Sequence, residues 1–346
     1  MNLAPAFKKY DAILVAGEDK ASYKVCDQHK AFLKIDDKHI INYVVEALRA
    51  AESVGDIYIV GSRDKLARAL EEDGIDTQSP KRIFVVEQKD NLYENIWYTF
   101  LKTLPPYERE IELENSKHRD RAVLIVPCDS PLITAHEIEY FISKCDPENY
   151  DHILGLTAEK DLEYFYPTKD QPGIKMAYLN LREAKYRINN LHMVKPIRIE
   201  NRHYIQKMYR YRYQRNIKNV ILFGLSVIGK DKPMSYQFYM GLQLGLLFNT
   251  LKFHRLAEFF RSWTPKNELE ASISRILKTR FMGLEVPFPG AALDIDNYKD
   301  WETLKLRFDE WRGYLHQLNQ KYPLSYRHEY RFDIMEPTPN APQNKF

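Results

Sequence analysis

The chain has few cysteines, no long apolar run and almost no net charge. Its three cysteines, Cys26, Cys128 and Cys145, are too few and too widely spaced for a disulfide framework or a zinc cage, which predicts a reducing, cytoplasmic location. The longest apolar runs, at 220–228 and 240–248, fall well short of the ~20 residues that span a bilayer. With 51 Lys+Arg against 48 Asp+Glu, the net charge of +3 is too even for a protein that covers a nucleic-acid backbone. We therefore expect a soluble protein with no nucleic-acid partner.

What the sequence does contain is a regular alternation of strands and helices. Five short runs that are apolar throughout predict buried strands: 12–16, 57–60, 83–86, 122–126 and 153–156. Four segments with helical periodicity lie between or beside them: 40–50, 65–72, 92–103 and 135–144. This pattern predicts an α/β fold in which helices cover both faces of a Rossmann-like, mostly parallel sheet. Ligands of such sheets lie beyond the carboxyl ends of the strands, so the loops after Ala16 and Val126 are the places to search.

The remainder of the chain adds to this core. We expect five regions: a core at 1–203, a helical insertion at 204–280, a return to the core at 281–305, a C-terminal helix with an extension at 306–335, and a mobile tail at 336–346. From Trp301 to Tyr322, apolar residues recur in steps of three and four. This seam predicts a long helix that packs on its own domain, with a homodimer contact through 301–322 as the alternative.

Three further patterns give weaker evidence about function. Residues 224–231 nearly match a phosphate-binding P-loop, but Asp231 stands where a Ser or Thr must hold magnesium. Residues 209–215 interleave tyrosines with arginines, which favours a solvated helix face or a small phosphate clamp over a nucleic-acid platform. An apolar stripe in the insertion predicts a helix that faces the core, with membrane-surface contact as the less favoured alternative. The stripe consists of Leu256, Phe259, Phe260 and Trp263.

Residues suited to phosphate and metal chemistry follow two of the predicted strands. Gly17 ends the first strand, where backbone N–H groups can approach a phosphate, and Lys30 supplies charge later in the same loop. Asp129 stands at the tip of a central strand, and a single carboxylate there suits Mg²⁺, which keeps water and phosphate oxygens as its other ligands. The alternative for Asp129 is a turn or a cap of the helix that starts near Thr134.

A second acidic motif lies far along the chain. Asp294 and Asp296 form an Asp-x-Asp whose carboxylates point to the same side if the segment is extended. The alternative is a cap of the following helix, made by Asp296 or Asn297. If the segment returns to the core, these acids meet Asp129 across one crevice that faces Lys30.

At this point a family resemblance becomes specific. The run AILVAG…HKAFLKIDDKHIINYVVEAL resembles the opening of MobA-like nucleotidyltransferases. Four later stretches resemble that family in the same order: NLYENI, CDSPLIT, YRINNLHMVKP and ALDIDNYKDWETL. YRINNLHMVKP resembles a stretch found in one large branch of the family, whose members carry a helical insertion. The resemblance spans roughly residues 11–305 and implies the sugar-nucleotide transferase (GT-A type) fold, a mixed, mostly parallel sheet with a helical insertion and a long C-terminal helix.

The resemblance also implies a reaction. It is the Mg²⁺-dependent transfer of a nucleotidyl group from an NTP to a phosphorylated small molecule, a sugar or polyol phosphate, with release of pyrophosphate. It implies catalytic roles for Lys30 and Asp129, and metal ligation by Asp129 with Asp294 or Asp296. Nucleotide contacts are expected from Leu14, Ala16, Gly17 and Asn95. Acceptor contacts are expected from Asn190 by motif position, and from Lys175, Arg212 or Arg215 by charge alone.

The phosphate loop departs from the family pattern. Glu18 and Asp19 follow Gly17 where active members continue with glycine and then arginine. Two carboxylates therefore stand where phosphates should arrive, and like charges 4 Å apart repel by about 1 kcal/mol even in water. Lys20 or Lys24 offsets them, the acids point away, or a second cation binds. The family's Gly-Gly-Asn is also changed, to Ile188-Asn189-Asn190. A glycosyltransferase that uses an NDP-sugar and a catalytically degenerate nucleotide-binding scaffold remain as alternatives.

Overall fold

The computed structural model describes most of the chain. The described residues are 8–18, 24–25, 28–105, 117–202, 204–205, 240–241, 243–245, 247–248, 251 and 253–324. The patterns at 209–215 and 224–231 and the tail at 336–346 lie outside them. Within the described part of the chain, no helix has the length and apolar character needed to cross a membrane.

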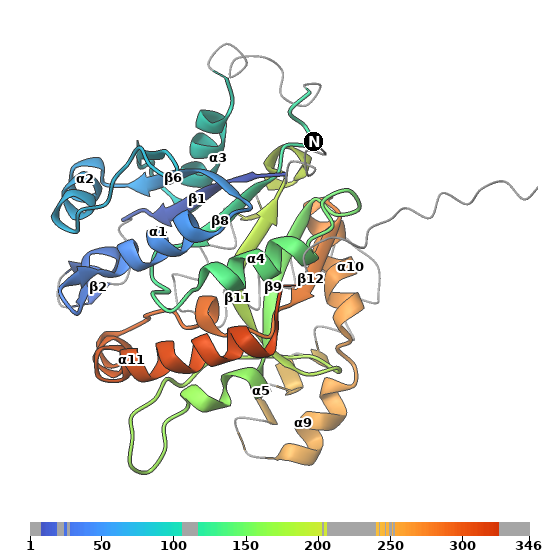
Figure 1. Cartoon of the computed structure of the whole chain (residues 1–346). Helices are drawn as coiled ribbons and strands as arrows, with labels where there is room; N and C mark the ends of the chain where they lie inside the picture. The colour runs from blue at the N-terminus through green and yellow to red at the C-terminus, as the bar shows by residue number, and fades with distance from the viewer. Residues whose placement is uncertain are drawn as a thin grey trace, which may run out of the picture.

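The core is a mixed, mostly parallel sheet of eight strands, as predicted (Figure 1). Seven strands follow the order β12-β9-β11-β8-β1-β6-β7, and β10 pairs with β11 beside this path. Their bounds are β1 Tyr10–Ala16, β6 Val54–Gly61, β7 Ile83–Glu87, β8 Val123–Pro127, β9 His152–Ala158, β10 Leu179–Asn180, β11 Lys185–Val194 and β12 Phe281–Glu285. β11 runs antiparallel to β8 and β9, while the other neighbours on the path are parallel. Two short hairpins, β2 Lys24–Val25 with β3 Gln28–His29 and β4 Lys34–Ile35 with β5 Lys38–His39, follow β1.

Helices cover both faces of the sheet. They are α1 Ile40–Ala50, α2 Arg63–Glu72, α3 Leu92–Thr103, α4 Ala135–Lys144, α5 Glu159–Leu162, α9 His254–Arg261, α10 Lys266–Leu277 and α11 Tyr298–Lys321. Because side chains alternate along a strand, Ala12 and Leu14 of β1 pack in one cluster with α1 and α4. Ile13 and Val15 pack with α3 in another cluster on the opposite face. The predicted helices at 40–50, 92–103 and 135–144 match α1, α3 and α4 at both ends.

The long C-terminal helix packs on its own domain, the first of the two arrangements expected for the seam. Four of its apolar side chains lie in a buried cluster with residues of α1 and of the loop after β1. They are Leu304, Phe308, Trp311 and Leu315. Leu318 and Tyr322 pack against the main core. The helix begins at Tyr298 and therefore crosses the predicted boundary between 305 and 306.

Part of the apolar stripe in the insertion is exposed, contrary to the expected core-facing helix. Leu256 and Phe259 of α9 are 45% and 55% exposed. Phe260 instead stacks on Phe248 with ring centroids 5.4 Å apart, and also contacts Trp263. The stripe therefore divides into a packed half and a half that faces outward among the described residues. Contact with a membrane surface stays a prediction.

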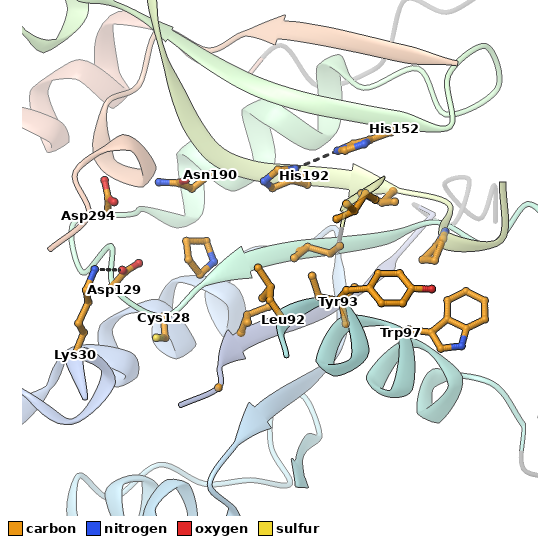
Figure 2. A pocket seen from close by; sticks show the side chains of 18 of the residues that line it. Lys30, Leu92, Tyr93, Trp97, Cys128, Asp129, His152, Asn190, His192 and Asp294 are labelled. Carbon is orange, nitrogen blue, oxygen red and sulfur yellow. Dashed lines mark hydrogen bonds and ion pairs between the residues drawn. The ribbon is translucent and has the colours of Figure 1, made fainter. Parts of the chain in front are cut away.

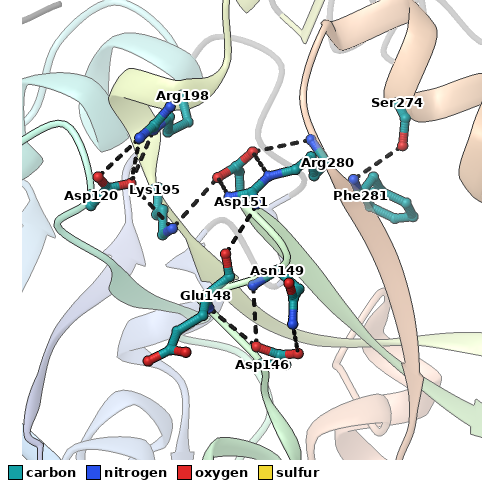
Figure 3. Close-up of polar contacts among 10 residues, drawn as sticks. All are labelled: Asp120, Asp146, Glu148, Asn149, Asp151, Lys195, Arg198, Ser274, Arg280 and Phe281. Carbon is teal, nitrogen blue, oxygen red and sulfur yellow. Dashed lines mark hydrogen bonds and ion pairs between the residues drawn. The ribbon is translucent and has the colours of Figure 1, made fainter. Parts of the chain in front are cut away.

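A polar cluster joins the amino ends of β8, β9 and β12 (Figure 3). Asp151, at the start of β9, accepts hydrogen bonds from Arg280 and lies 3.5 Å from Lys195 Nζ. Asp120 accepts two hydrogen bonds from Arg198, at 3.0 and 2.9 Å, and a third from Lys195 Nζ at 3.3 Å. Three cations thus surround two carboxylates, and the cluster ties together strands that are distant in sequence.

Candidate active site

A cavity of about 1000 Å³ opens at the opposite edge of the sheet, beyond the carboxyl ends of β1 and β8 (Figure 2). Its charged end is lined by Gly17, Lys30, Asp129, Asn190, Asp294 and Asp296. The structure therefore brings together residues from four segments that are far apart in sequence. The loops after Ala16 and Val126, which the strand pattern indicated, form two sides of this end.

Lys30 lies between two carboxylates. Its Nζ is 3.1 Å from Asp129 Oδ2 and 3.3 Å from Asp296 Oδ1. Lys30 starts a short 3-10 helix, Lys30–Phe32, and His29 Nδ1 accepts the N–H of Ala31 at its N-terminus. Burial lowers the pKa of Lys30, but the charges of Asp129 and Asp296 outweigh this effect and raise it above its ordinary value. The lysine is therefore fully protonated, and its position matches the expected meeting of the three segments.

Neither Asp129 nor Asp296 caps a helix, whereas Asn297, the other residue predicted as a cap, does so. Thr134, not Asp129, caps α4: its Oγ1 accepts the N–H of Glu137 at 3.1 Å. Asn297 caps α11 in the same way, through an N–H donated by Asp300, also at 3.1 Å. Because other residues cap both helices, the carboxylates of Asp129 and Asp296 are available to the cavity.

Asp294 is the more buried member of the acid pair. Its Oδ1 accepts a hydrogen bond from Arg187 Nη2, and Arg187 Nε donates to the carbonyl of Ala292 at 2.7 Å. Burial raises the pKa of Asp294, and the charge of Asp129 raises it further, although Arg187 opposes both effects. Among the described residues, the carboxylates at this end outnumber the cations that contact them, because Asp129, Asp294 and Asp296 share Lys30 and Arg187.

A buried glutamate anchors the segment that carries this acid pair. Glu137 on α4 is fully buried, and both its carboxylate oxygens lie 3.1 Å from the N–H of Ala291. Asn189 Nδ2 donates to Glu137 Oε1 at 3.0 Å. Gly290 is required here, because an added Cβ would lie 2.5 Å from Glu137 Oε2. Burial outweighs these hydrogen bonds and raises the pKa of Glu137 to about 8.

The altered Ile188-Asn189-Asn190 stretch forms an irregular turn within β11. The pairing register between β11 and β9 shifts between Ile188 and His192. Asn190 has a φ of 66°, a left-handed conformation that asparagine tolerates better than most residues. Its side chain lines the cavity and donates from Nδ2 to the carbonyl of Ala291 at 3.2 Å. Asn189, which stands in place of a family glycine, and Asn190, which stands where the family also has asparagine, thus hold the acid-bearing segment from one side.

Ser130 and the backbone of Asp129 hold the same segment from the other side. Ser130 Oγ donates to the carbonyl of Ala291 at 3.1 Å, and Ile295 N donates to the carbonyl of Asp129 at 3.0 Å. Hydrogen bonds to backbone carbonyls therefore tie the acid-bearing segment to Asp129, in addition to the ion pairs through Lys30. Sequence analysis found the acids but missed Glu137 and Arg187, because a single acid or base in a strand or helix carries no local signal.

The glycine of the phosphate loop is set by Asn95. An added Cβ on Gly17 would lie 2.5 Å from Asn95 Nδ2, so only glycine fits without a shift. Asn95 is buried on α3, and its Oδ1 accepts the N–H of Lys89. Gln88 holds the next residue, with Oε1 accepting the N–H of Glu18 at 2.7 Å. Asn95 lies behind the loop and is not among the described residues that line the cavity, so any effect it has on a nucleotide acts through Gly17.

The carboxylate of Glu18 points away from the phosphate site. Both its oxygens lie 2.9 Å from Lys65 Nζ on α2. Gly17 lines the cavity and Glu18 does not. Of the possibilities left open by the sequence, the structure shows the carboxylate of Glu18 turned away, with Lys65 as a partner. Asp19 lies outside the described residues.

The remaining predicted site residues lie elsewhere. Leu14 and Ala16 are buried in the core, so only their backbone could face a ligand. Lys175 is exposed and is not among the cavity-lining residues that the structure describes. Arg212 and Arg215 lie outside the described residues. The roles expected for these residues stay predictions.

The cavity has a second, mostly apolar end that sequence analysis did not foresee. Figure 2 shows Lys30, Asp129, Asn190 and Asp294 at one end, and Tyr93, Trp97 and His152 at the other. The second end is lined by α3, by the face of the sheet and by residues after β11. His152 Nε2 and His192 Nδ1 are 3.1 Å apart on its sheet wall.

No three acids, histidines or cysteines in the described part of the chain form a preformed metal cage. Asp129 with Asp294 or Asp296 supplies two carboxylates, which is the protein contribution that Mg²⁺ takes when substrate phosphates complete its shell. The surplus of carboxylates over cations and the hard oxygen donors fit such an ion. These residues therefore fit the ion that the family resemblance implies.

Comparison with known proteins agrees with this architecture. The family model of the MobA-like NTP transferase domain matches residues 12–215, well over half of the chain. No curated protein matches the chain significantly. Among solved structures, one titled a hypothetical transferase from Thermus thermophilus is 18% identical, with a TM-score of 0.54, and the match covers 84% of this chain and 99% of that one. At this identity the likeness shows the fold alone, and it confirms the predicted fold class.

Two further solved structures have lower TM-scores. A 4-diphosphocytidyl-2C-methyl-D-erythritol synthase from Anaerococcus prevotii is 12% identical, with a TM-score of 0.41 over 87% of this chain and 99% of that one. A CMP:2-keto-3-deoxy-manno-octonic acid synthetase complexed with CTP is 11% identical, with a TM-score of 0.42 over 88% and 99%. Both scores are too low for these structures to inform substrate or mechanism here.

Proposed function

This chain belongs to the family of MobA-like NTP transferase domains, and we propose on that premise that it transfers a nucleotidyl group from an NTP to a phosphorylated small molecule. Membership makes it a nucleotidyltransferase, which sets aside the glycosyltransferase and the inactive scaffold. The acceptor, the metal and the residue roles are the proposed part. A sugar or polyol phosphate is the acceptor that the resemblance implies.

The observation that carries this proposal is the position of Lys30 between Asp129 and Asp296. A cation flanked by carboxylates at the carboxyl end of β8 lies beside Gly17, where a triphosphate can approach the backbone. Such a cluster suits polyphosphate chemistry, because it combines a mobile ammonium group with acids that can hold a metal ion. Lys30 is free to turn from the carboxylates to the phosphates when a nucleotide and its metal neutralise the acids.

The reaction needs positioning and charge neutralisation more than a base. An oxygen of the acceptor phosphate attacks the α-phosphorus of the NTP, the bond to the β-phosphate breaks, and pyrophosphate leaves with the electron pair. A phosphate monoester has a second pKa of about 6 and is mostly dianionic near neutral pH, so no Ser–His pair is required. Lys30 would stabilise charge that develops on the phosphates, and Gly17 would admit the triphosphate to the backbone.

Asp129, with Asp294 or Asp296, would hold Mg²⁺. When bound, the ion supplies Lewis-acid neutralisation of the phosphate oxygens. The residues of this chain fix where that charge lies: Ser130, Asn190 and Glu137 tie the acid-bearing segment to β8, β11 and α4. Arg187 holds Asp294 in place from the side away from Lys30.

Pyrophosphate release tests this proposal. The protein is incubated with each of the four NTPs, Mg²⁺ and a panel of sugar and polyol phosphates, with EDTA replacing Mg²⁺ in a parallel series. We expect turnover with one NTP, lost in EDTA. Lys30→Met is expected to lower kcat by about 10²–10³, the scale seen when one preorganised donor to a developing charge is removed.

Lys34→Met is the matched control for that variant. Lys34 is a half-exposed lysine whose partner is Glu72, on the outside of the molecule. Its kcat should stay within about twofold of wild type, because surface ion pairs contribute little. If Lys30→Met retained the wild-type kcat, the role assigned to Lys30 would be wrong. If no NTP raised the melting temperature with Mg²⁺ present, the site itself would be misplaced.

A further inference from the structure

The two ends of the cavity differ sharply in chemistry. The charged end holds every carboxylate among the described lining residues. The other end has walls of aliphatic and aromatic side chains. Val15, Ile125 and Val194 line it from the sheet, and Ile96 and Trp97 line it from α3. We call this end, together with Ile199 and Ile205, the apolar chamber. It is continuous with the charged end, so one ligand can occupy both.

Among the described lining residues, the histidines and the arginine of the apolar chamber are already engaged with one another or with aromatic side chains. Arg202 lies over the Trp97 ring, 4.3 Å from its centroid, and hydrogen-bonds to the Tyr93 hydroxyl. His152 and His192 bond to each other. Burial lowers the pKa of His152 to about 3 and that of His192 to about 4, so both rings are neutral near pH 7.

These properties disfavour a polyhydroxylated ligand. Each hydroxyl that leaves water for the apolar chamber needs a new hydrogen-bond partner, and an unpaired one is costly. His152 Nδ1 is buried without a hydrogen-bond partner, and Nε2 of the same ring is paired with His192 Nδ1, so the two rings offer few nitrogens to a ligand. A sugar ring would bring several hydroxyls against Ile, Val and Trp side chains. A hydrocarbon chain would instead gain from every methylene that it buries.

We propose that the apolar chamber binds the hydrocarbon part of the acceptor, so that the acceptor is the phosphate monoester of an aliphatic alcohol with one chain. Its phosphate lies at the charged end beside Lys30, and its chain extends between α3 and the sheet toward Trp97. The inference rests on the proposed function and narrows its acceptor class. The phosphate of such an acceptor would lie near Lys30 and the site carboxylates, and its carbon chain would contact the apolar side chains of the chamber.

A series of linear alkyl monophosphates tests the proposal. Pyrophosphate release is measured with ethyl, butyl, hexyl, octyl and decyl phosphate, below their aggregation concentrations, against glucose 1-phosphate and glycerol phosphate. We expect kcat/KM to rise by about threefold for each added methylene until the chain fills the chamber. The same series, without NTP, should raise the melting temperature increasingly with chain length.

One variant of α3 and a matched control localise the effect. Ile96→Asn places an amide in the apolar chamber and should remove the dependence on chain length in both measurements. Leu101→Asn is the control, because Leu101 packs on the same hydrophobic cluster and does not line the cavity. It should keep the wild-type slope. Both variants should keep the shift in melting temperature caused by NTP and Mg²⁺.

The outcomes separate this inference from the proposed function. A flat response to chain length, with glucose 1-phosphate or glycerol phosphate as the better acceptor, would overturn the apolar acceptor and leave nucleotidyl transfer intact. Displacement of the alkyl phosphates by a nucleoside alone would assign the chamber to the nucleobase and also overturn it. Failure of every NTP to bind would overturn the proposed function, while the thermal series in the absence of NTP still decides whether the chamber takes a hydrocarbon.

Discussion

Two carboxylate clusters lie at opposite ends of the strands of the same sheet and differ in their charge balance. At the amino ends of the strands, Asp120 and Asp151 meet three cations and form a network of short hydrogen bonds (Figure 3). At the carboxyl ends, three carboxylates share two cations (Figure 2). Among the described contacts, the cations of the first cluster outnumber its carboxylates by one, and the carboxylates of the second cluster outnumber its cations by one. The same residue types therefore serve stability at one edge and leave room for a ligand cation at the other.

The pKa shifts express this difference. Burial alone would raise the pKa of Asp151, but the hydrogen bonds and charge of Arg280 outweigh burial and hold that pKa below its usual range. Asp294 is also buried and also bonds to an arginine, yet its pKa is raised. At Asp294, burial and then the charge of Asp129 outweigh Arg187, whereas at Asp151 the hydrogen bonds and charge of Arg280 and the charge of Lys195 outweigh burial. In the folded protein, cations and hydrogen bonds compensate the carboxylates of the first cluster, whereas the carboxylates of the second cluster still repel one another.

The largest effect expected is the loss of turnover in Asp129→Asn. The substitution removes a proposed metal ligand but keeps the shape and the backbone bond that holds Ile295. We expect kcat to fall by about 10³ or more. The unfolding free energy without Mg²⁺ should change by less than about 1 kcal/mol, because repulsion among the acids is relieved as the contact with Lys30 is lost. Pyrophosphate release and urea unfolding measure the two quantities.

A large stability loss in Asp129→Asn, or undiminished turnover, would contradict this contrast between the clusters. In the first case the site would be a structural ion pair like that of Asp151. In the second case the metal assignment would be wrong. The addition of Mg²⁺ and NTP should stabilise the wild type and have little effect on the variant.

Asp151→Asn should show the reverse pattern. It leaves Arg280 with a single amide oxygen in place of a carboxylate and deprives the buried Lys195 of a partner. Removal of one partner from a buried pair costs about 3–5 kcal/mol, so urea unfolding should show a loss of this size. The kcat of the folded variant should match that of wild type, because no member of this cluster is among the described residues that line the cavity.

The same variant gives a dependence on pH. The folded pKa of Asp151 lies below its unfolded value, so its contribution to stability is present above about pH 4, the ordinary pKa of an aspartate, and is lost as the pH falls through the folded pKa. The gap in unfolding free energy between wild type and Asp151→Asn should therefore be constant near pH 7 and shrink below pH 4. A gap that grew on acidification would reverse the sign of the shift.

The fold could be predicted further from the sequence than the site could. Runs such as 12–16 and 122–126 are apolar on both faces, and that pattern alone defines a covered parallel sheet. β11 escaped the same method, because its polar residues Arg187, Asn189 and Asn190 break the apolar run. Those residues are polar because they hold the acid-bearing segment. The polar residues that serve the site therefore hid the strand pattern of β11, which runs antiparallel to its neighbours β8 and β9.

At the site, the sequence indicated the acids and Lys30 but not what holds them. The family resemblance and the position at a strand tip predicted Asp129 and the Asp-x-Asp as site residues. In the structure, Lys30 contacts both Asp129 and Asp296. Glu137 could not be predicted, because a glutamate in the first turn of a helix ordinarily faces solvent. The apolar chamber could not be predicted either, since it is formed by side chains from four separate elements. Contacts between distant segments are set by packing, which local pattern does not encode.

The smallest effect expected concerns Glu18, a carboxylate beside the phosphate loop that Lys65 already neutralises outside the cavity. Because Lys65 neutralises it on the outside of the cavity, Glu18→Gln should change the KM for NTP by less than about threefold and the unfolding free energy by less than about 1 kcal/mol. Lys65→Met is more informative, since it leaves the charge of Glu18 unpaired beside the phosphate loop. We expect its KM for NTP to rise by about threefold to tenfold at low salt and less at high salt. The double variant should return to the KM of Glu18→Gln. If Lys65→Met had no effect on KM while Asp129→Asn abolished turnover, the charge of Glu18 would be too remote to matter, and only the cluster around Lys30 would act on the nucleotide.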